Sequence, residues 1–113
     1  MTDTADLTAS EALAAIRAGR LAAADYRDAC LDRIAAREGT IRAFAWLDPA
    51  LVRRSAPAQG PLAGMPIGVK DVIDTADMPS QYESPIWAGH RPRSDAACVA
   101  AARAAGAVVM GKT

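Results

Sequence analysis

Lys70 is the residue of this sequence whose setting best suits acid–base chemistry, because it directly follows the short apolar run Ile67–Val69. An amine held against apolar surface loses hydration, which favours its neutral form, and a neutral amine can act as a general base. Asp71 and Asp74 follow closely and could anchor the lysine or the turn after it. The opposing interpretation is a strand-end lysine that extends into solvent, and the local pattern alone favours it because perturbed lysines are rare.

A segment further on, Gly106–Thr113, matches the nucleotide-binding pattern G-x-x-x-x-G-K-[ST]. That pattern requires a strand before it and a helix N-terminus after it, where the phosphates bind. Here a helical segment precedes the match, and Ala107–Met110 favours a buried strand whose N–H groups are occupied in a sheet. The favoured interpretation is a helix-stop glycine, a core strand and a polar strand end, with a P-loop nucleotide binder as the alternative.

The cysteines and the histidine give no metal-binding pattern. Cys30 and Cys98 are far apart in sequence, and neither lies at a ligand spacing from His90, the single histidine. Both cysteines fall on expected helices, where a small apolar side chain suits the core. We expect neither a metal nor a cofactor.

Composition limits the remaining classes of function. The chain has 113 residues, the size of one domain, and is 51% hydrophobic but only 4% aromatic, so its core is expected to be thin. Thirteen basic and thirteen acidic residues give a net charge of zero, which argues against a nucleic-acid partner. The start of the chain resembles no export signal, and no apolar run approaches the roughly 20 residues of a membrane span. We therefore expect a cytoplasmic protein with reduced thiols and no membrane partner.

Helices are expected to dominate the first half of the chain. Thr8 and Glu11 form a capping-box pattern that starts a helix, and Gly19 is its expected stop. A second helix is predicted from about Leu21 to Arg37, ending near Gly39, because its apolar residues recur at three- and four-residue spacing.

The sequence pattern changes after these helices. A short strand is expected within residues 41–46, and Asp48-Pro49 predicts a short helix through Arg54. Residues 56–61 are rich in alanine, proline and glycine, which breaks the pattern. The domain therefore divides into a helical region, 1–56, and an α/β region, 60–113.

The α/β region is expected to place Lys70 at the end of a strand. Strands near Ile67–Lys70 and at Ala107–Met110 would flank a helix over 96–105, capped by Ser94 and Asp95. Such a βαβ unit has parallel strands and a right-handed crossover. Between them lies a long loop, Thr75–Pro92, which contains aromatic residues, and long ordered loops are more often functional than incidental.

Three blocks of this region, in order, resemble the amidase signature family. Residues Gly60–Thr75, GPLAGMPIGVKDVIDT, resemble the family pattern G-P-L-x-G-[IM]-P-[IV]-x-[VL]-K-D-x-[IF]-D-T. Residues Ser84–Pro92, SPIWAGHRP, resemble a loop found in many of its bacterial amidases, and Asp95–Thr113 resembles the helix and strand that follow. The chain is also similar to amidotransferase A-subunit-like amidases. The resemblance implies the truncated N-terminal part of an amidase-signature α/β fold: N-terminal helices, then a mixed, partly parallel sheet with flanking helices.

The resemblance implies a catalytic role for Lys70. In this family a Ser–cis-Ser–Lys unit cleaves carboxamides, and the lysine matches Lys70. The neutral lysine takes a proton from the bridging serine, which activates the nucleophilic serine to form an acyl-enzyme. The family's two serines lie in a Gly/Ser-rich segment beyond the position of Thr113. None of the chain's own serines lies in a glycine-rich run, and these are Ser10, Ser55, Ser80, Ser84 and Ser94.

These points define the expected function. The chain is expected to be an incomplete amidase domain, a hydrolase of small-molecule amides by resemblance, and inactive alone. An alternative is a non-catalytic remnant or interaction fragment that self-associates through an exposed sheet edge at Ala107–Met110. Two residues depart from the family pattern, Asp77 where glycine is usual and Glu83 where a small residue is usual. Left-handed backbone tolerates both poorly, so the geometry of their loop is open to doubt.

Overall fold

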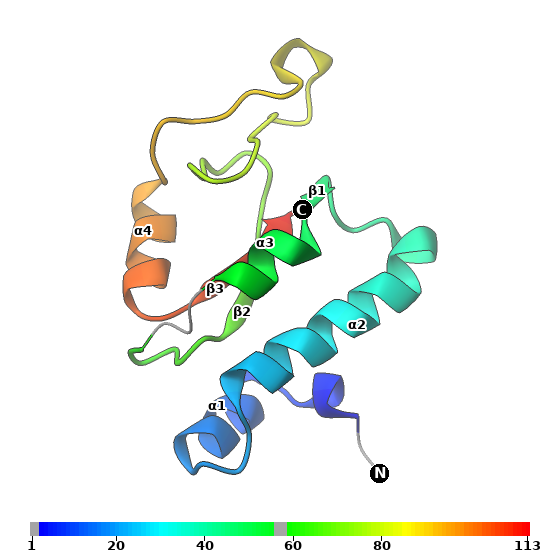
Figure 1. The fold of residues 1–113 in the computed structure, drawn as a ribbon. Helices are drawn as coiled ribbons and strands as arrows, with labels where there is room; N and C mark the ends of the chain where they lie inside the picture. The colour runs from blue at the N-terminus through cyan, green and yellow to red at the C-terminus, as the bar shows by residue number, and fades with distance from the viewer. Residues whose placement is uncertain (1–2, 56–58) are drawn as a thin grey trace.

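A three-stranded mixed sheet forms the centre of the computed structural model, which describes residues 3–55 and 59–113 (Figure 1). The strands are β1 (Trp46–Leu47), β2 (Pro66–Val69) and β3 (Val108–Lys112), in the order β1-β3-β2. Strand β3 pairs antiparallel with β1 and parallel with β2. The predicted α/β class with a mixed, partly parallel sheet is confirmed.

Helices surround this sheet. The α-helices are α1 (Ala9–Arg17), α2 (Ala23–Ile41), α3 (Pro49–Arg54) and α4 (Ala97–Ala104), and the 3₁₀ helices are η1 (Thr4–Asp6) and η2 (Pro85–Trp87). In Figure 1, α4 and α2 lie on opposite sides of the strands, and residues 70–95 form a long excursion between β2 and α4. The predicted division at residues 56–60 stays a prediction; β1, from the first part, pairs with β3 from the second.

Local capping signals confirm α1 and α3. Both bonds of the capping box are present, since Glu11 donates its N–H to the Thr8 hydroxyl and the Glu11 carboxylate accepts the N–H of Thr8. Gly19 follows α1 with φ of +74°, a conformation that glycine adopts without strain. The Asp48 side chain caps α3, with Pro49 in its first turn. Residues 56–58, part of the predicted break, lie outside the described residues.

Two helix ends differ from the prediction. Helix α2 runs through Gly39 to Ile41, because the carboxylate of Glu38 then accepts the N–H groups of Ala43 and Phe44, both at 2.8 Å. The expected strand over 41–46 is accordingly reduced to Trp46–Leu47.

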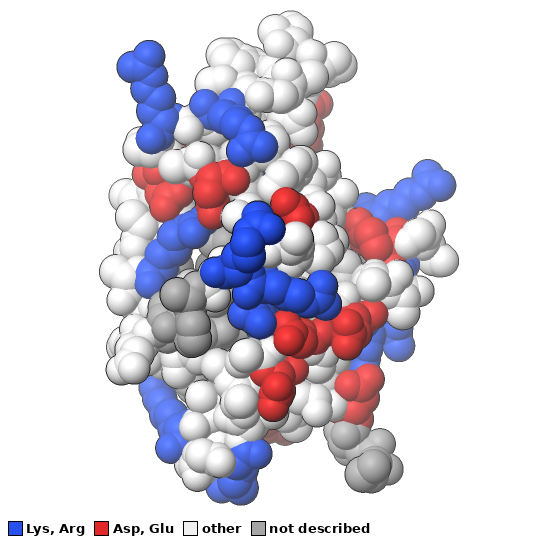
Figure 2. Space-filling model, viewed as in Figure 1, with Lys and Arg blue, Asp and Glu red and all other residues white. Residues whose placement is uncertain are grey.

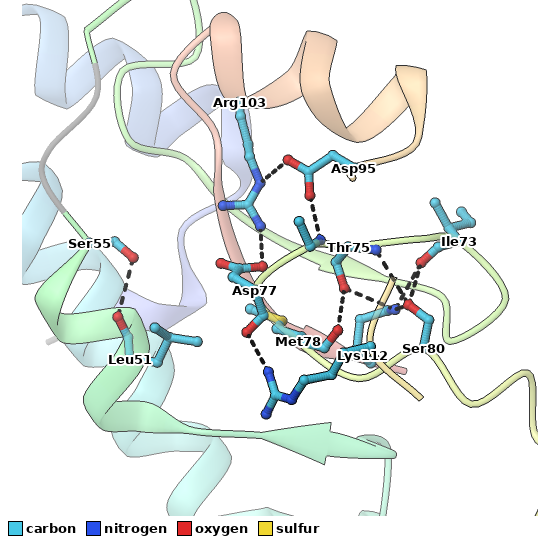
Figure 3. A network of polar contacts seen from close by, with 12 residues as sticks. Leu51, Ser55, Ile73, Thr75, Asp77, Met78, Ser80, Asp95, Arg103 and Lys112 are labelled. Carbon is cyan, nitrogen blue, oxygen red and sulfur yellow. Dashed lines mark hydrogen bonds and ion pairs between the residues drawn. The ribbon is translucent and has the colours of Figure 1, made fainter. Parts of the chain in front are cut away.

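The N-cap predicted for α4 is also wrong. The helix starts after Ala96 with no side-chain cap. The Asp95 carboxylate instead accepts the N–H of Ala76 at 2.8 Å and pairs with Arg103 at 3.3 Å (Figure 3). A partner distant in sequence thus outcompetes the local cap.

Successive residues of β3 supply two layers of core. One layer joins β3 to α2 and α3 through Leu31, Val52, Val108 and Met110. The other joins β3 to β2, α4 and the long loop through Val69, Met78, Val99 and Val109. The central position of β3 corrects the expectation of an unpaired edge at Ala107–Met110: within the described residues, the sheet edges are β1 and β2. Self-association remains a prediction, now to be sought at those edges.

Charged side chains of both signs are interleaved on the face shown in Figure 2. Several are paired, as when Arg33 contacts Asp3 at 2.8 Å and Asp6 at 2.7 Å. Over residues 3–55 and 59–113, we find no helix with the length and apolar character needed to span a bilayer.

Candidate active site around Lys70

Lys70 lies at the carboxyl end of the parallel pair β2–β3. The strands stay in contact past their ends, since Thr113 donates its N–H to the Val69 carbonyl at 2.9 Å and Asp71 donates to the Thr113 carbonyl at 2.8 Å. The carboxyl ends of parallel strands are where open α/β sheets present their ligand-binding groups. The position of Lys70 therefore suits a catalytic side chain.

The side chain of Lys70 is about half exposed, at 53%, and its ammonium forms an ion pair with the Glu83 carboxylate. Among the described residues, Glu83 is the only side chain to which Lys70 Nζ is hydrogen-bonded. This matches the alternative of a lysine that extends into solvent. An exposed pair of this kind contributes at most about 1 kcal/mol to stability.

The turn that carries Glu83 is held by a buried carboxylate. Asp71, only 1% exposed, accepts the N–H of Gln81 through Oδ1 at 3.1 Å and that of Glu83 through Oδ2 at 3.2 Å. Tyr82 and Glu83 both have left-handed backbone, with φ of +54° and +57°. The sequence left the geometry at Glu83 open, and the structure shows it to be left-handed; the Asp71 bonds offset a strain of about 1–3 kcal/mol per residue.

A second carboxylate holds the same turn from its other side. The Tyr82 hydroxyl donates to Asp74 Oδ1 at 2.6 Å, and this bond to a carboxylate is the main cause that raises the pKa of Tyr82. The Tyr82 ring packs edge-on against Trp87, with ring centres 5.4 Å apart, and Trp87 in turn packs on His90 at 5.1 Å. The loop aromatics therefore anchor their own loop, and Asp71 and Asp74 anchor the turn.

The sequence also left the backbone at Asp77 open, and the structure shows no strain there. Asp77 does not have a positive φ, and its carboxylate pairs with Arg103 of α4 at 2.8 Å (Figure 3). An aspartate at this position ties the long loop to α4, which a glycine could not do.

Lys112 has a buried, fully hydrogen-bonded environment that the sequence did not predict. It is completely buried, and its ammonium donates to Ile73 O at 2.8 Å, Thr75 Oγ1 at 3.2 Å and Ser80 Oγ at 2.6 Å (Figure 3). It also donates to Pro79 O at 3.3 Å. Desolvation lowers the pKa of this ammonium, and the charges of nearby Asp71, Asp74 and Asp77 partly counteract that effect.

A β-bulge in β3 explains why Lys112 is buried. The partners of Ile67 and Gly68 on β3 are Val109 and Gly111, so Met110 is an extra residue in the strand. Strict alternation would put Lys112 on the same face as Val108 and Met110, but one inserted residue changes the face. Lys112 instead reaches the loop that surrounds Met78, on the side of Val109.

The P-loop alternative is contradicted by this arrangement. Residues Val108–Lys112 are a buried strand paired on both sides, rather than a loop around a phosphate. The Lys112 ammonium is already occupied by four protein oxygens. Nothing in this geometry leaves it free for a nucleotide.

The other candidate residues take structural places. Cys30 is half-buried beside the core, as expected, and burial raises the pKa of its thiol. Cys98 is exposed, so its expected core position is wrong. Ser80 is fully buried in the Lys112 network, whereas Ser84 caps η2 through its hydroxyl. Within the described part of the chain, no group of three histidine, cysteine, aspartate or glutamate side chains could hold a metal ion.

Lys70 thus lies at the carboxyl end of a parallel strand pair in an α/β fold, and comparison with known proteins identifies the family of the chain. The family model named Amidase matches residues 20–113, so the chain belongs to the amidase family. The A subunit of the glutamyl-tRNA(Gln) amidotransferase of Chloroflexus aurantiacus is 43% identical over 122 aligned residues, and its counterpart in Salinispora arenicola is 40% identical over 123. These alignments cover 99% and 100% of the chain, which spans only 25% of either relative.

Solved structures give the same family. The peptide amidase of Stenotrophomonas maltophilia superposes with a TM-score of 0.80 and 36% identity over 96% of this chain and 25% of its own. A 6-aminohexanoate cyclic dimer hydrolase superposes with a TM-score of 0.86 and 28% identity, over 99% of this chain and 24% of its own. The chain therefore corresponds to about a quarter of an amidase-family enzyme.

Proposed function

We propose that this chain supplies the lysine-bearing part of an amidase active site that hydrolyses small-molecule carboxamides. Lys70 is the general base of a Ser–cis-Ser–Lys unit, and it accepts the proton that leaves the nucleophilic serine through the bridging serine. The observation that carries this proposal is the position of Lys70, exposed at the carboxyl end of β2–β3, inside the region that matches the amidase family.

The exposure of Lys70 supports this role, because a proton acceptor must be reachable by the group that it deprotonates. Glu83 occupies Nζ in the structure. The pair must therefore open, or Glu83 must turn aside, before Nζ can accept a proton from a hydroxyl. The two left-handed residues that form this turn are a place where such a change costs little regular structure.

The 113 residues alone are proposed to be inactive, because none of their serines lies in a glycine-rich run and none hydrogen-bonds Lys70 in the part that the structure describes. In the described chain Lys70 hydrogen-bonds only Glu83, and Ser80 is buried against the other lysine. We expect the purified chain to release no ammonia from simple carboxamides above a Lys70→Ala control. Release that Lys70→Ala abolishes would contradict this part of the proposal.

A chimera tests the catalytic role itself. In it, this chain replaces the matching quarter of the Stenotrophomonas peptide amidase, and circular dichroism and thermal unfolding verify the fold. We expect amide hydrolysis that Lys70→Met reduces by about 10⁴-fold or more, the scale on which loss of a triad member acts. A folded chimera whose activity survives Lys70→Met would overturn the assignment.

Size-exclusion chromatography separates the alternative, an interaction fragment. A concentration-independent monomer with cooperative thermal unfolding would argue against association through the sheet edges β1 and β2. The chain's cytoplasmic location, and its lack of a nucleic-acid or membrane partner, stay expectations from its composition.

A further inference from the structure

Lys112 is a buried cation whose hydrogen-bond partners are all neutral oxygens. Burying an ammonium without a directly paired carboxylate is costly unless its donors are satisfied. Its three N–H groups face four oxygens between 2.6 and 3.3 Å away, so each donor has an acceptor. The loop therefore compensates for the burial of the ammonium by surrounding it with acceptors.

The four oxygens close one loop. Ile73 lies at its start, Pro79 and Ser80 at its end, and Thr75 between them. The Ser80 hydroxyl completes the closure, since it donates to Ile73 O at 3.3 Å and accepts the N–H of Thr75 at 3.3 Å. One ammonium thus fastens both ends of residues 73–80 to the end of β3.

Lys70 lies next to this closed loop on one side and its partner Glu83 on the other. The N–H of Ile73 donates to the Lys70 carbonyl at 2.9 Å, immediately before the loop. Immediately after it, Asp71 takes the N–H groups of Gln81 and Glu83. The loop held by Lys112 therefore sets where Lys70 and the facing turn lie relative to each other.

We propose that Lys112 is a positioning residue of the Lys70 site: its buried ammonium holds residues 73–80 closed, and the closed loop holds Lys70 and the turn 81–83 in place. The inference concerns the geometry around Lys70, and its catalytic meaning rests on the amidase function proposed above. Lys112 itself touches no substrate, because it is completely buried.

A catalytic serine–lysine pair is the rival interpretation, since Lys112 Nζ lies 2.6 Å from Ser80 Oγ. Two observations oppose it. Both residues are 0% exposed, so a carbonyl substrate has no approach. The Ser80 hydroxyl donates to Ile73 O, and its acceptor positions are taken by Lys112 and Thr75. A nucleophile needs a free lone pair and access, and Ser80 has neither.

The chain itself offers a sharp test, because Lys70 and Lys112 are its only two lysines. We would compare Lys112→Met with the matched control Lys70→Met by amide hydrogen exchange in the intact chain. Lys112→Met is expected to reduce protection of the N–H groups of Ser80, Gln81 and Glu83 at least about tenfold more than protection of the α2 amides, which fall only with the global stability, as in sub-global opening. Lys70→Met should leave these amides unchanged. Unchanged amides in Lys112→Met would overturn the proposal, and so would an equal loss over the whole chain.

Restoring the charge distinguishes positioning from mere filling of space. In a Cys30→Ala, Cys98→Ala background, Lys112→Cys would be alkylated with 2-bromoethylamine in denaturant and refolded, which recreates a lysine-like ammonium. Protection at Gln81 and Glu83 that returns after alkylation supports the proposal. Protection that is already at the wild-type level in Lys112→Met, which fills the space without a charge, contradicts it. If Lys112→Met does not fold, Thr75→Val and Ser80→Ala remove acceptors singly and should loosen the same amides.

The kinetics of the active chimera provide a separate test of the proposal. In the active chimera, Lys112→Met should lower kcat by up to about 100-fold with little change in KM, as expected for misplaced catalytic groups. An inactive chimera defeats the amidase proposal but leaves the exchange result standing. Labelling of Ser80 by a fluorophosphonate, lost in Lys112→Met, would establish the serine–lysine pair instead and overturn positioning.

Discussion

The two lysines of this chain lie at neighbouring strand ends in opposite surroundings. Lys70 follows β2, is half exposed and faces a carboxylate. Lys112 ends β3, pairs in register with Val69, is completely buried and faces neutral oxygens. The comparison shows that exposure and hydrogen-bonding partners differ sharply between the two. The amine of Lys70 is accessible from solvent, whereas that of Lys112, among the described residues, hydrogen-bonds only to the loop that encloses it.

The largest expected difference between the lysines is in stability. Lys112→Met removes four hydrogen bonds from the ammonium. Ile73 O still accepts from the Ser80 hydroxyl and Ser80 Oγ from the Thr75 N–H, whereas Pro79 O and Thr75 Oγ1 lose the ammonium as donor. Each group left unsatisfied costs about 1–3 kcal/mol, partly offset by the removed cost of a buried charge. We expect a net loss of about 2–4 kcal/mol in the free energy of unfolding. Lys70→Met should cost less than about 1 kcal/mol, as for an exposed ion pair. Urea unfolding of both variants measures this, and equal losses would break the comparison.

The glycines beside the lysines provide a second contrast. A Cβ at Gly111, next to Lys112, would lie 2.7 Å from the Trp46 carbonyl oxygen of β1, so the backbone must move. A Cβ at Gly68, near Lys70, meets only a Thr113 methyl at 3.2 Å. We expect Gly111→Ala to destabilise the chain by about 1–3 kcal/mol, as overpacking does, and Gly68→Ala by less than about 1 kcal/mol. Thermal unfolding of the pair checks this; a harmless Gly111→Ala would show that β1 is not held against β3 as described.

The pH dependence of stability sharpens the contrast further. Burial lowers the pKa of Lys112 in the folded chain below its ordinary value of 10.5, so between these two pKa values the unfolded state binds more protons than the folded state. Stability contributed by this site therefore rises with pH across that window, by at most about 1.4 kcal/mol per pH unit. The difference in unfolding free energy between wild type and Lys112→Met, measured over the alkaline range up to the ordinary lysine pKa, isolates this rise from tyrosine and cysteine titration. A flat difference would contradict a desolvated ammonium.

The smallest expected effects come from Glu83. Glu83→Gln removes the charge opposite Lys70 and should change stability by less than about 1 kcal/mol. Glu83→Gly also relieves the left-handed backbone and should stabilise the chain by about 1 kcal/mol relative to Glu83→Gln. Competitive acetylation followed by mass spectrometry should show faster modification of Lys70 in both variants, with Lys112 unreactive in the folded chain. Acetylation of Lys112 at a comparable rate would refute its burial.

The sequence predicted those elements whose signals are local. The capping box at Thr8 and the Asp48-Pro49 pair placed the starts of α1 and α3, because each depends on contacts within one turn. The apolar run Ile67–Val69 placed Lys70 after a strand, which the structure confirms, while the catalytic role that the family blocks imply for it stays a proposal.

Features that depend on distant partners were missed. Asp95 binds Ala76 and Arg103 instead of capping α4, and the Met110 bulge turns Lys112 into the core. The central position of β3 could not be predicted without β1. Strand β1 is only two residues long and gives almost no sequence pattern of its own. Register and long-range pairing are not encoded in any single stretch of residues.

The central strand has a consequence for how the chain folds. Strand β3 follows both of its neighbours in sequence, and residue pairs such as Trp46 and Lys112 are far apart along the chain. Until residues 108–112 have left the ribosome, β1 and β2 have no β3 to pair with, whereas α1 and α2 can form from local contacts. Pairing of β1 and β2 therefore waits for β3, and non-local pairing of this kind folds slowly. The same event buries Lys112, so the loop beside Lys70 closes only when β3 has paired with β1 and β2.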